Sequence, residues 1–129
     1  MKDYSFAYGK GRVTFPLDEK NVLAVLHGND YPAVDDIGAA LVESLSRPID
    51  AEPLPRQLRP EDRVALVVSD MSRFWMRQDL VIPHLVAYLE RECGIPDGAI
   101  TIVVANGTHT GSDERELRTL ITDAVYDRI

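Results

Sequence analysis

The run Arg63-Val-Ala-Leu-Val-Val-Ser69 sets the fold class, together with Ala99-Ile-Thr-Ile-Val-Val-Ala105 further along the chain. Near-continuous apolar runs of this length are typical of strands buried on both faces of a parallel sheet. A helical pattern over residues 79–93 connects the two runs, and a second helix is predicted from Ser112 onward. This order predicts a βαβα core over residues 63–129, in an open, mostly parallel, Rossmann-like α/β sheet.

The predicted helix over residues 79–93 carries its own start and stop signals. Its apolar side chains recur every four residues: Val81, Leu85, Leu89 and Cys93. Pro83 falls in the first turn, where backbone N–H groups have no helical partner, so the helix tolerates it. Gly94 favours the left-handed conformation that ends a helix. Cys93 is expected to be an inert buried thiol because it lies on the apolar stripe.

Residues 1–62 are expected to form an irregular, strand-containing lead-in to this core. Arg12-Val-Thr-Phe-Pro-Leu17 alternates between apolar and polar side chains and predicts a short edge strand. Asn21-Val-Leu-Ala-Val-Leu-His27 is apolar enough to predict a strand buried on both faces. A helix is predicted over residues 34–46, and four prolines stiffen the connector over residues 47–62.

The composition excludes several classes of protein. A length of 129 residues suits a single α/β domain that spans the whole chain. The formal net charge of −7 argues against a nucleic-acid-binding surface. No apolar run approaches the ~20 residues that cross a bilayer, so no membrane contact is expected. The single cysteine permits no internal disulfide, which favours a cytoplasmic protein.

Polar side chains follow both predicted core strands directly. Ser69-Asp70-Met71-Ser72-Arg73 comes after the first strand, and Asn106-Gly-Thr-His-Thr110 comes after the second. Ligands of open parallel sheets bind beyond the carboxyl ends of the strands, and neighbouring strands lie ~5 Å apart. If the two strands are neighbours, Asp70, Arg73 and His109 therefore converge on one crevice.

Each of these groups has a chemical role that fits a binding or catalytic site. Arg73 offers a planar fork of donors for a carboxylate or phosphate, and Asp70 is placed to orient it. His109 is the natural proton acceptor or donor near neutral pH, and Gly107 lets a ligand approach the backbone. The remaining candidates for binding substrate or cofactor carry hydroxyl groups: Ser72, Thr108 and Thr110. The N–H groups of the helix after Ser112 are a further candidate for holding an anion.

Plainer interpretations of the same residues stay open. An Asp-x-x-Arg pair in a loop is usually a local salt bridge, and a Gly-Thr-His-Thr turn is usually a helix entry with a solvated histidine. A hydrolase built from Ser69 or Ser72 with His109 and Asp70 lacks the supporting Gly-x-Ser-x-Gly elbow. Three scattered histidines and one cysteine form no metal site at a recognised spacing, so no metal ligand is expected.

In their order and spacing, these motifs resemble the amino-terminal domain of the lactate racemase family, whose enzymes depend on a nickel-pincer nucleotide. The segments that carry the resemblance are Tyr8-Gly-Lys10, Arg59-Pro-Glu-Asp-Arg-Val-Ala-Leu-Val-Val-Ser-Asp70, Ser72-Arg73, Gly94-Ile-Pro-Asp97, Ile102-Val-Val-Ala-Asn-Gly-Thr-His109 and Ser112-Asp-Glu-Arg-Glu-Leu117. The resemblance implies an isomerase, a racemase or epimerase of small 2-hydroxy acids. It implies that hydride moves to the cofactor and back while histidines transfer the hydroxyl proton.

By position, the resemblance implies that His109 is one acid/base histidine, that Arg73 holds the substrate carboxylate and that Asp70 supports the site. The chain departs from the family pattern at Phe74-Trp75, where a proline is usual, and at Thr110, where an arginine is common. The family's second histidine, its nickel-binding histidine and its cofactor-tethering lysine are expected beyond residue 129.

All three lysines precede position 21 and do not match the tethering lysine: Lys2, Lys10 and Lys20. We therefore expect this chain to be a domain fragment that alone binds no cofactor and is inactive. Its expected partners are a small 2-hydroxy acid and the remaining domain of the same protein. The alternative is a non-catalytic α/β domain that binds an anionic ligand or a partner chain.

Overall fold

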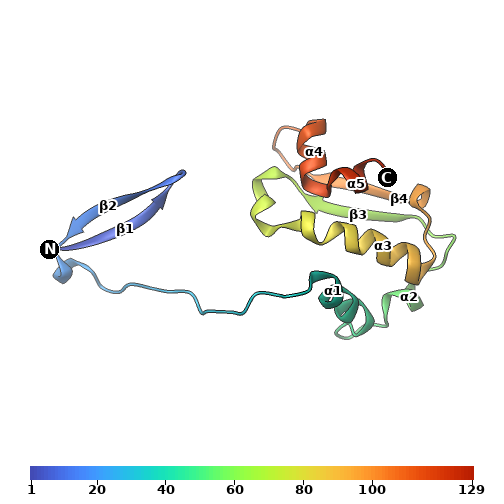
Figure 1. Ribbon diagram of the computed structural model, residues 1–129, viewed down its shortest axis with the longest axis horizontal. Helices are drawn as coiled ribbons and strands as arrows, with labels where there is room; N and C mark the ends of the chain where they lie inside the picture. The colour runs from blue at the N-terminus through green and yellow to red at the C-terminus, as the bar shows by residue number, and fades with distance from the viewer. The chain divides into compact units, whose positions relative to one another are not determined.

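The computed structural model describes residues 1–129 and divides into two compact units, Met1–Ala33 and Val34–Ile129 (Figure 1). The chain is a mixed α/β structure with two small sheets, one antiparallel and one parallel. The boundary between the units lies inside the predicted lead-in, so residues 34–62 belong to the unit that contains the parallel sheet. No helix combines the length and the apolar character that crossing a bilayer requires.

The first unit contains a β-hairpin. β1 (Lys2–Tyr8) pairs antiparallel with β2 (Gly11–Leu17), and Gly9 at the turn adopts a φ of 56°. A positive φ is typical of two-residue hairpin turns and favours glycine. The strand predicted over residues 12–17 is confirmed, whereas β1 was not predicted, although Tyr4, Phe6 and Tyr8 alternate along it.

The buried strand predicted over residues 21–27 is wrong. A 3-10 turn covers Glu19–Asn21, and residues 22–33 form no helix or strand. Leu23 is fully exposed, and Leu26 is 91% exposed. An apolar run becomes a strand only where a neighbouring strand pairs its backbone groups and other side chains cover it. Neither condition is met for this segment.

The second unit begins with a helix close to its predicted position. α1 (Ile37–Ser46) starts three residues later than the predicted range of 34–46. Asp36 marks the start because its carboxylate accepts a hydrogen bond from the backbone N–H of Ala39 at 2.8 Å. This contact satisfies one of the backbone donors that a helix start leaves unpaired.

α3 (Ile82–Cys93) confirms the helix predicted over residues 79–93, with a 3-10 turn at Gln78–Leu80 in front of it. Pro83 lies in its first turn, and Gly94 ends it with a φ of 70°. Cys93 is buried, and burial raises the pKa of its thiol, as expected for a structural cysteine. α2 (Leu54–Gln57) is a short helix, and its Leu54 packs against the hydrophobic core to which α3 contributes.

The two predicted core strands are neighbours. β3 (Val64–Ser69) and β4 (Ile100–Ala105) pair in parallel, with Val64 opposite Ile100 and Ser69 opposite Ala105. α3 and a 3-10 turn at Asp97–Ala99 connect them. α4 (Glu114–Ile121) and α5 (Asp123–Tyr126) follow (Figure 1). The βαβα order is therefore present, but two strands alone do not establish a Rossmann-like sheet.

One face of the parallel sheet carries the hydrophobic core. Side chains of α3, α4 and α5, among them Leu89, Leu120 and Val125, are buried together with Val68 of β3 and Ile100 of β4. The apolar area that these helices remove from water is the main stabilising contribution.

The opposite face of the parallel sheet is open. Val67 is 70% exposed and Val103 is 44% exposed. The prediction that both strands are buried on both faces is therefore wrong. Alternate residues of a strand point to opposite faces, and the helices that form the core cover only the face of Val68 and Ile100.

The last predicted helix is divided. α4 ends at Ile121, Thr122 adopts a φ of 74°, and α5 begins at Asp123. Asp113 caps α4, one residue after the predicted start at Ser112, because its carboxylate accepts a hydrogen bond from the backbone N–H of Glu116 at 2.8 Å.

Candidate functional site

The carboxyl ends of β3 and β4 bring two polar loops together. Ser69 and Ala105, the last residues of the two strands, are paired in the sheet. Directly beyond them, Oδ2 of Asp70 lies 2.5 Å from Nδ1 of His109, although 39 residues separate the two along the chain. This carboxylate–imidazole pair confirms the predicted convergence of Asp70 and His109 and is the centre of the candidate site.

Asp70 organises the loop that follows β3. It caps a 3-10 turn at Met71–Met76, in which the backbone N–H of Ser72 donates to Oδ1 of Asp70 at 3.2 Å. The hydroxyl of Ser72 donates to the same oxygen at 2.6 Å. Asp70 is only 7% exposed, and both of its oxygens have hydrogen-bond partners. A buried carboxylate requires such partners.

The same hydrogen bonds act on the protonation of Asp70. They hold the pKa of its carboxyl below the ordinary value of 3.8, with the Ser72 hydroxyl as the largest cause and His109 as the next. Burial acts in the opposite direction, because it penalises the charged form. Asp70 is therefore an ionised carboxylate at neutral pH.

His109 lies on a tight turn after β4. The turn contains Gly107 at a φ of 58°, and the backbone N–H of His109 donates to the carbonyl of Asn106 at 2.9 Å. An ionised carboxylate only accepts hydrogen bonds. The contact between Nδ1 of His109 and Asp70 therefore assigns the ring proton of neutral His109 to Nδ1. Nε2 then carries the lone pair. Because 60% of the side chain is exposed, the ring is accessible to a ligand.

Arg73 does not pair with Asp70, so the prediction that Asp70 orients Arg73 is wrong. The plainer prediction of a local Asp-x-x-Arg salt bridge is wrong for the same reason. Ser72 and His109 already occupy the oxygens of Asp70. Arg73 is exposed and forms no ion pair with any carboxylate of the chain. Its guanidinium is therefore available to an anion from outside.

The other predicted binding residues lie on the same two loops, and of these Ser72 contacts the pair through Asp70. Thr108 and Thr110 are exposed, and Ser72 is exposed apart from its contacts to Asp70. The backbone conformation at Gly107 favours glycine, because its φ lies in the left-handed region. A Cβ atom at this position would meet nothing within 4 Å.

The geometry does not favour two of the predicted alternatives, a serine hydrolase and an anion site at the start of α4. The Ser72 hydroxyl donates to Asp70 rather than to His109, so the serine–histidine contact of a hydrolase is not formed. The start of α4 is occupied by the carboxylate of Asp113, and Glu114 and Glu116 add negative charge to its first turn. These carboxylates disfavour an anion at that helix start.

Gln78 is a residue of this region that the sequence did not indicate. Its side-chain amide contacts both backbone groups of Ser69, the residue before Asp70. The only available sign was a polar amide next to an apolar helix start, which is too common a pattern to predict a contact.

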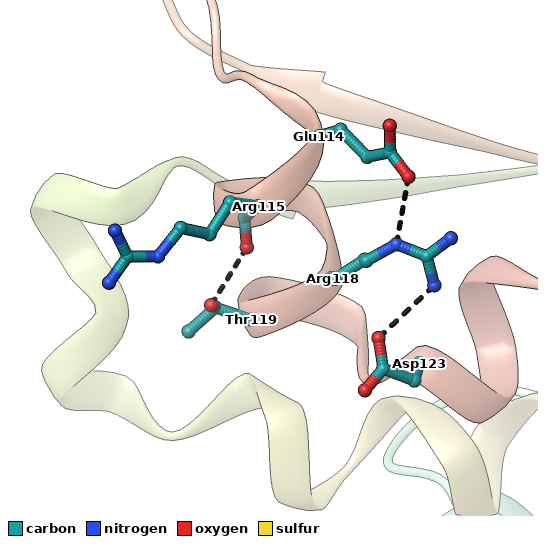
Figure 2. A pocket seen from close by; sticks show the side chains of 5 residues that line it. All are labelled: Glu114, Arg115, Arg118, Thr119 and Asp123. Carbon is teal, nitrogen blue, oxygen red and sulfur yellow. Dashed lines mark hydrogen bonds and ion pairs between the residues drawn. The ribbon is translucent and has the colours of Figure 1, made fainter.

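A separate hollow on the surface lies over α4 and α5 (Figure 2). Its lining consists of Glu114, Arg115, Arg118, Thr119 and Asp123. The guanidinium of Arg118 pairs with Glu114 at 3.0 Å, with Asp123 at 3.1 Å and with Asp127 at 2.9 Å. It also lies 4.2 Å from the ring centroid of Tyr126. The hydrogen bonds with Glu114, Asp127 and Asp123 raise the pKa of Arg118, and the contact with Asp123 joins α4 to α5.

The other two histidines lie on other segments of the chain. His84 is on α3, and its ring packs closely on Gly38 of α1. A Cβ atom at position 38 would lie 2.9 Å from Nδ1 of His84. His27 lies in the segment of the first unit without helix or strand. No three side chains among His, Cys, Asp and Glu are grouped so that they could hold a metal ion.

The family model described as the lactate racemase N-terminal domain matches residues 8–129. A search of curated proteins gives no match.

Proposed function

The chain belongs to the lactate racemase N-terminal domain family, and from this we propose that it contributes substrate-binding and proton-transfer residues to a racemase or epimerase of small 2-hydroxy acids. The observation that carries this proposal is the contact between Asp70 and His109 at the carboxyl ends of β3 and β4. Reversing the configuration of a 2-hydroxy acid through its ketone requires a group that takes the hydroxyl proton and returns it. A histidine held by a carboxylate is suited to that task.

In the proposed reaction, Nε2 of His109 is the atom that moves the proton. Asp70 accepts the hydrogen bond from Nδ1, so the lone pair of neutral His109 is on Nε2 and can take the hydroxyl proton. The imidazolium that forms is stabilised by the adjacent carboxylate of Asp70. When the hydroxyl is restored, the same nitrogen returns the proton.

Arg73 is proposed to bind the carboxylate of the substrate. A guanidinium forms two parallel hydrogen bonds with a carboxylate, which fixes the orientation of the acid as well as its position. The absence of an internal partner for Arg73 supports this role, because no ion pair has to break. The remaining contacts to substrate or cofactor are proposed for Ser72, Gly107, Thr108 and Thr110.

The family implies a nickel-pincer nucleotide as the hydride acceptor, but the residues of this chain do not fit a site that ligates its metal ion and tethers it through a lysine. The structure has no group of three potential metal ligands. The lysines lie in the hairpin unit, where Lys2 pairs with Glu19 at 3.7 Å and Lys20 pairs with Asp18 at 2.9 Å. We therefore propose that another domain of the full-length protein holds the cofactor, and that residues 1–129 alone are inactive.

Three further features belong to the same proposal. The order β3, α3, β4, α4 supports a Rossmann-like sheet. The family model covers residues of both compact units, which supports their acting as one domain of the enzyme. The single, buried cysteine supports a reducing, cytoplasmic location.

A second candidate function is favoured by the same unpaired guanidinium. An exposed Arg73 on the loop after β3 and an exposed His109 on the loop after β4 are also suited to a non-catalytic domain that binds an anionic ligand or an acidic partner chain. The two functions differ in the role of His109. It transfers a proton in the first function and only contributes a contact in the second.

The test uses the full-length protein. Racemisation of a panel of 2-hydroxy acids and bound nickel are measured for the wild type, for His109→Ala and for His27→Ala, in which the histidine lies in the segment of the first unit without helix or strand. We expect His109→Ala to lower kcat by about 10²–10⁴-fold at unchanged nickel content. His27→Ala is expected to match the wild type. Racemisation that is unchanged in His109→Ala would remove this residue from the mechanism.

A further inference from the structure

Gln78 is tied to the end of β3 by two hydrogen bonds. The backbone N–H of Ser69 donates to Oε1 of Gln78 at 3.1 Å, and Nε2 of Gln78 donates to the carbonyl of Ser69 at 2.6 Å. Both contacts are partly buried, and nine residues separate the two partners. One side-chain amide therefore satisfies both backbone groups of a single strand residue.

This contact lies on the edge of β3 that no strand covers. β3 pairs only with β4. At Ser69, the amide of Gln78 supplies the donor and the acceptor that a neighbouring strand would otherwise supply. The last residue of β3 is therefore paired in register with Ala105 of β4 and hydrogen-bonded to Gln78 through its own backbone groups.

The contact also closes the loop that carries the candidate site. We define the β3 loop as residues 70–77, which contain Asp70, Ser72 and Arg73. Its two ends adjoin Ser69 and Gln78, which are hydrogen-bonded to each other. The last loop residue, Arg77, adopts a φ of 54°, in the left-handed region that L side chains rarely adopt. Such a conformation persists only where the surrounding contacts hold it.

Asp79 is one of the contacts that hold the end of the loop. Its carboxylate accepts hydrogen bonds from Nε of Arg77 at 3.0 Å and from Nη2 of Arg77 at 2.9 Å. The backbone N–H of Arg77 also donates to the carbonyl of Phe74 at 2.9 Å. Arg77 and Gln78 thus fix the far end of the β3 loop, while Ser69 fixes its start.

From this geometry we propose that Gln78 is a positioning residue, which holds the β3 loop so that the carboxylate of Asp70 meets Nδ1 of His109. Asp70 follows Ser69 directly, so a shift of the Ser69 backbone moves the carboxylate of Asp70. The contact between Asp70 and His109 is short and joins two different loops, so a small displacement is enough to weaken it. Calling this pair the acid–base centre rests on the proposed function, but the hydrogen-bonding role of Gln78 does not.

The test uses the 129-residue chain and needs no catalytic activity. Gln78→Met keeps the length of the side chain and removes both hydrogen bonds. Gln57→Met is the matched control, because Nε2 of Gln57 also donates to a backbone carbonyl, that of Glu52, outside the β3 loop. The readouts are the titration of the Asp70 carboxyl by ¹³C NMR and the hydrogen exchange of the Ser72 amide, which donates to Asp70.

In Gln78→Met, we expect the pKa of Asp70 to rise toward its ordinary value and the Ser72 amide to exchange about tenfold faster, the size of effect expected when one hydrogen bond is lost. Gln57→Met is expected to change neither readout. If Gln78→Met does not fold, Gln78→Asn replaces it, since its amide is one methylene too short to span both groups of Ser69.

A purely structural Gln78 would lower the melting temperature without changing these two readouts. An Asp70 titration and a Ser72 exchange rate equal to those of the control would therefore overturn the proposal. Loss or retention of racemisation does not enter this test, so its failure is distinguishable from failure of the proposed function.

Discussion

Leu120 offers the sharpest test of where the core lies. Its side chain is completely buried in α4, among the side chains that cover one face of the parallel sheet. Leu120→Ala removes that packing and leaves a cavity, which costs about 2–5 kcal/mol at a fully buried leucine. The core unit, Val34–Ile129, is of a size at which 1 kcal/mol shifts the melting temperature by about 4–8 °C. We expect the melting temperature to fall by at least about 8 °C.

The matched control is the same substitution at Leu23. That side chain is fully exposed in the first unit, so Leu23→Ala is expected to change the free energy of unfolding by less than about 0.5 kcal/mol. Thermal and urea unfolding followed by circular dichroism measure both variants. An equal loss of stability in the two variants would show that residues 21–27 are buried, as their sequence pattern predicts, and would refute the described packing.

Two further predictions concern stability. The folded-state pKa of Asp70 lies below 3.8, so its ionised form stabilises the fold fully above the unfolded pKa, and this contribution is lost as the pH falls through the folded pKa. The urea midpoint of the wild type should therefore exceed that of Asp70→Asn near pH 6, and the difference should shrink toward pH 2. A difference that stays constant with pH would contradict this. Gly94→Ala should destabilise the chain by at least about 1 kcal/mol in the same assay, because Gly94 has a φ of 70° and a Cβ would lie 3.2 Å from Pro60. Gly98→Ala, whose Cβ meets nothing within 4 Å, is the control, and an equal effect of the two substitutions would count against the strain argument.

The regular elements of the second unit were predictable because their signals are local. The apolar runs of β3 and β4, the four-residue spacing of α3 and the glycine that ends it depend on residues near in sequence. Whether helices cover one or both faces of the parallel sheet was not predictable in the same way. An apolar run indicates that a strand can be buried, whereas burial depends on which other elements pack against it. Val67 on the open face and Leu23 in the first unit both illustrate this.

The sequence was enough to predict which two loops form the site, but not every contact within them. The convergence of Asp70 and His109 followed from the rule that neighbouring parallel strands present their carboxyl ends at one edge. The partner of Asp70 was predicted wrongly, because a charge three residues away favours a local ion pair with Arg73 on spacing alone. In the structure, the Ser72 hydroxyl and His109 occupy that carboxylate. Such competition is decided by loop geometry, as is the contact of Gln78 with Ser69.

The central claim is that Asp70 holds His109 through Nδ1 and leaves Nε2 to move a proton. ¹H–¹⁵N NMR of the imidazole rings at about pH 9, well above the range in which histidines are usually protonated, reports directly which nitrogen carries the hydrogen. For the wild type we predict that His109 is the Nδ1–H tautomer. In Asp70→Ala the ring is predicted to show the same tautomer mixture as the exposed His27. A wild-type His109 that carries its hydrogen on Nε2, or that matches His27, would contradict the claim.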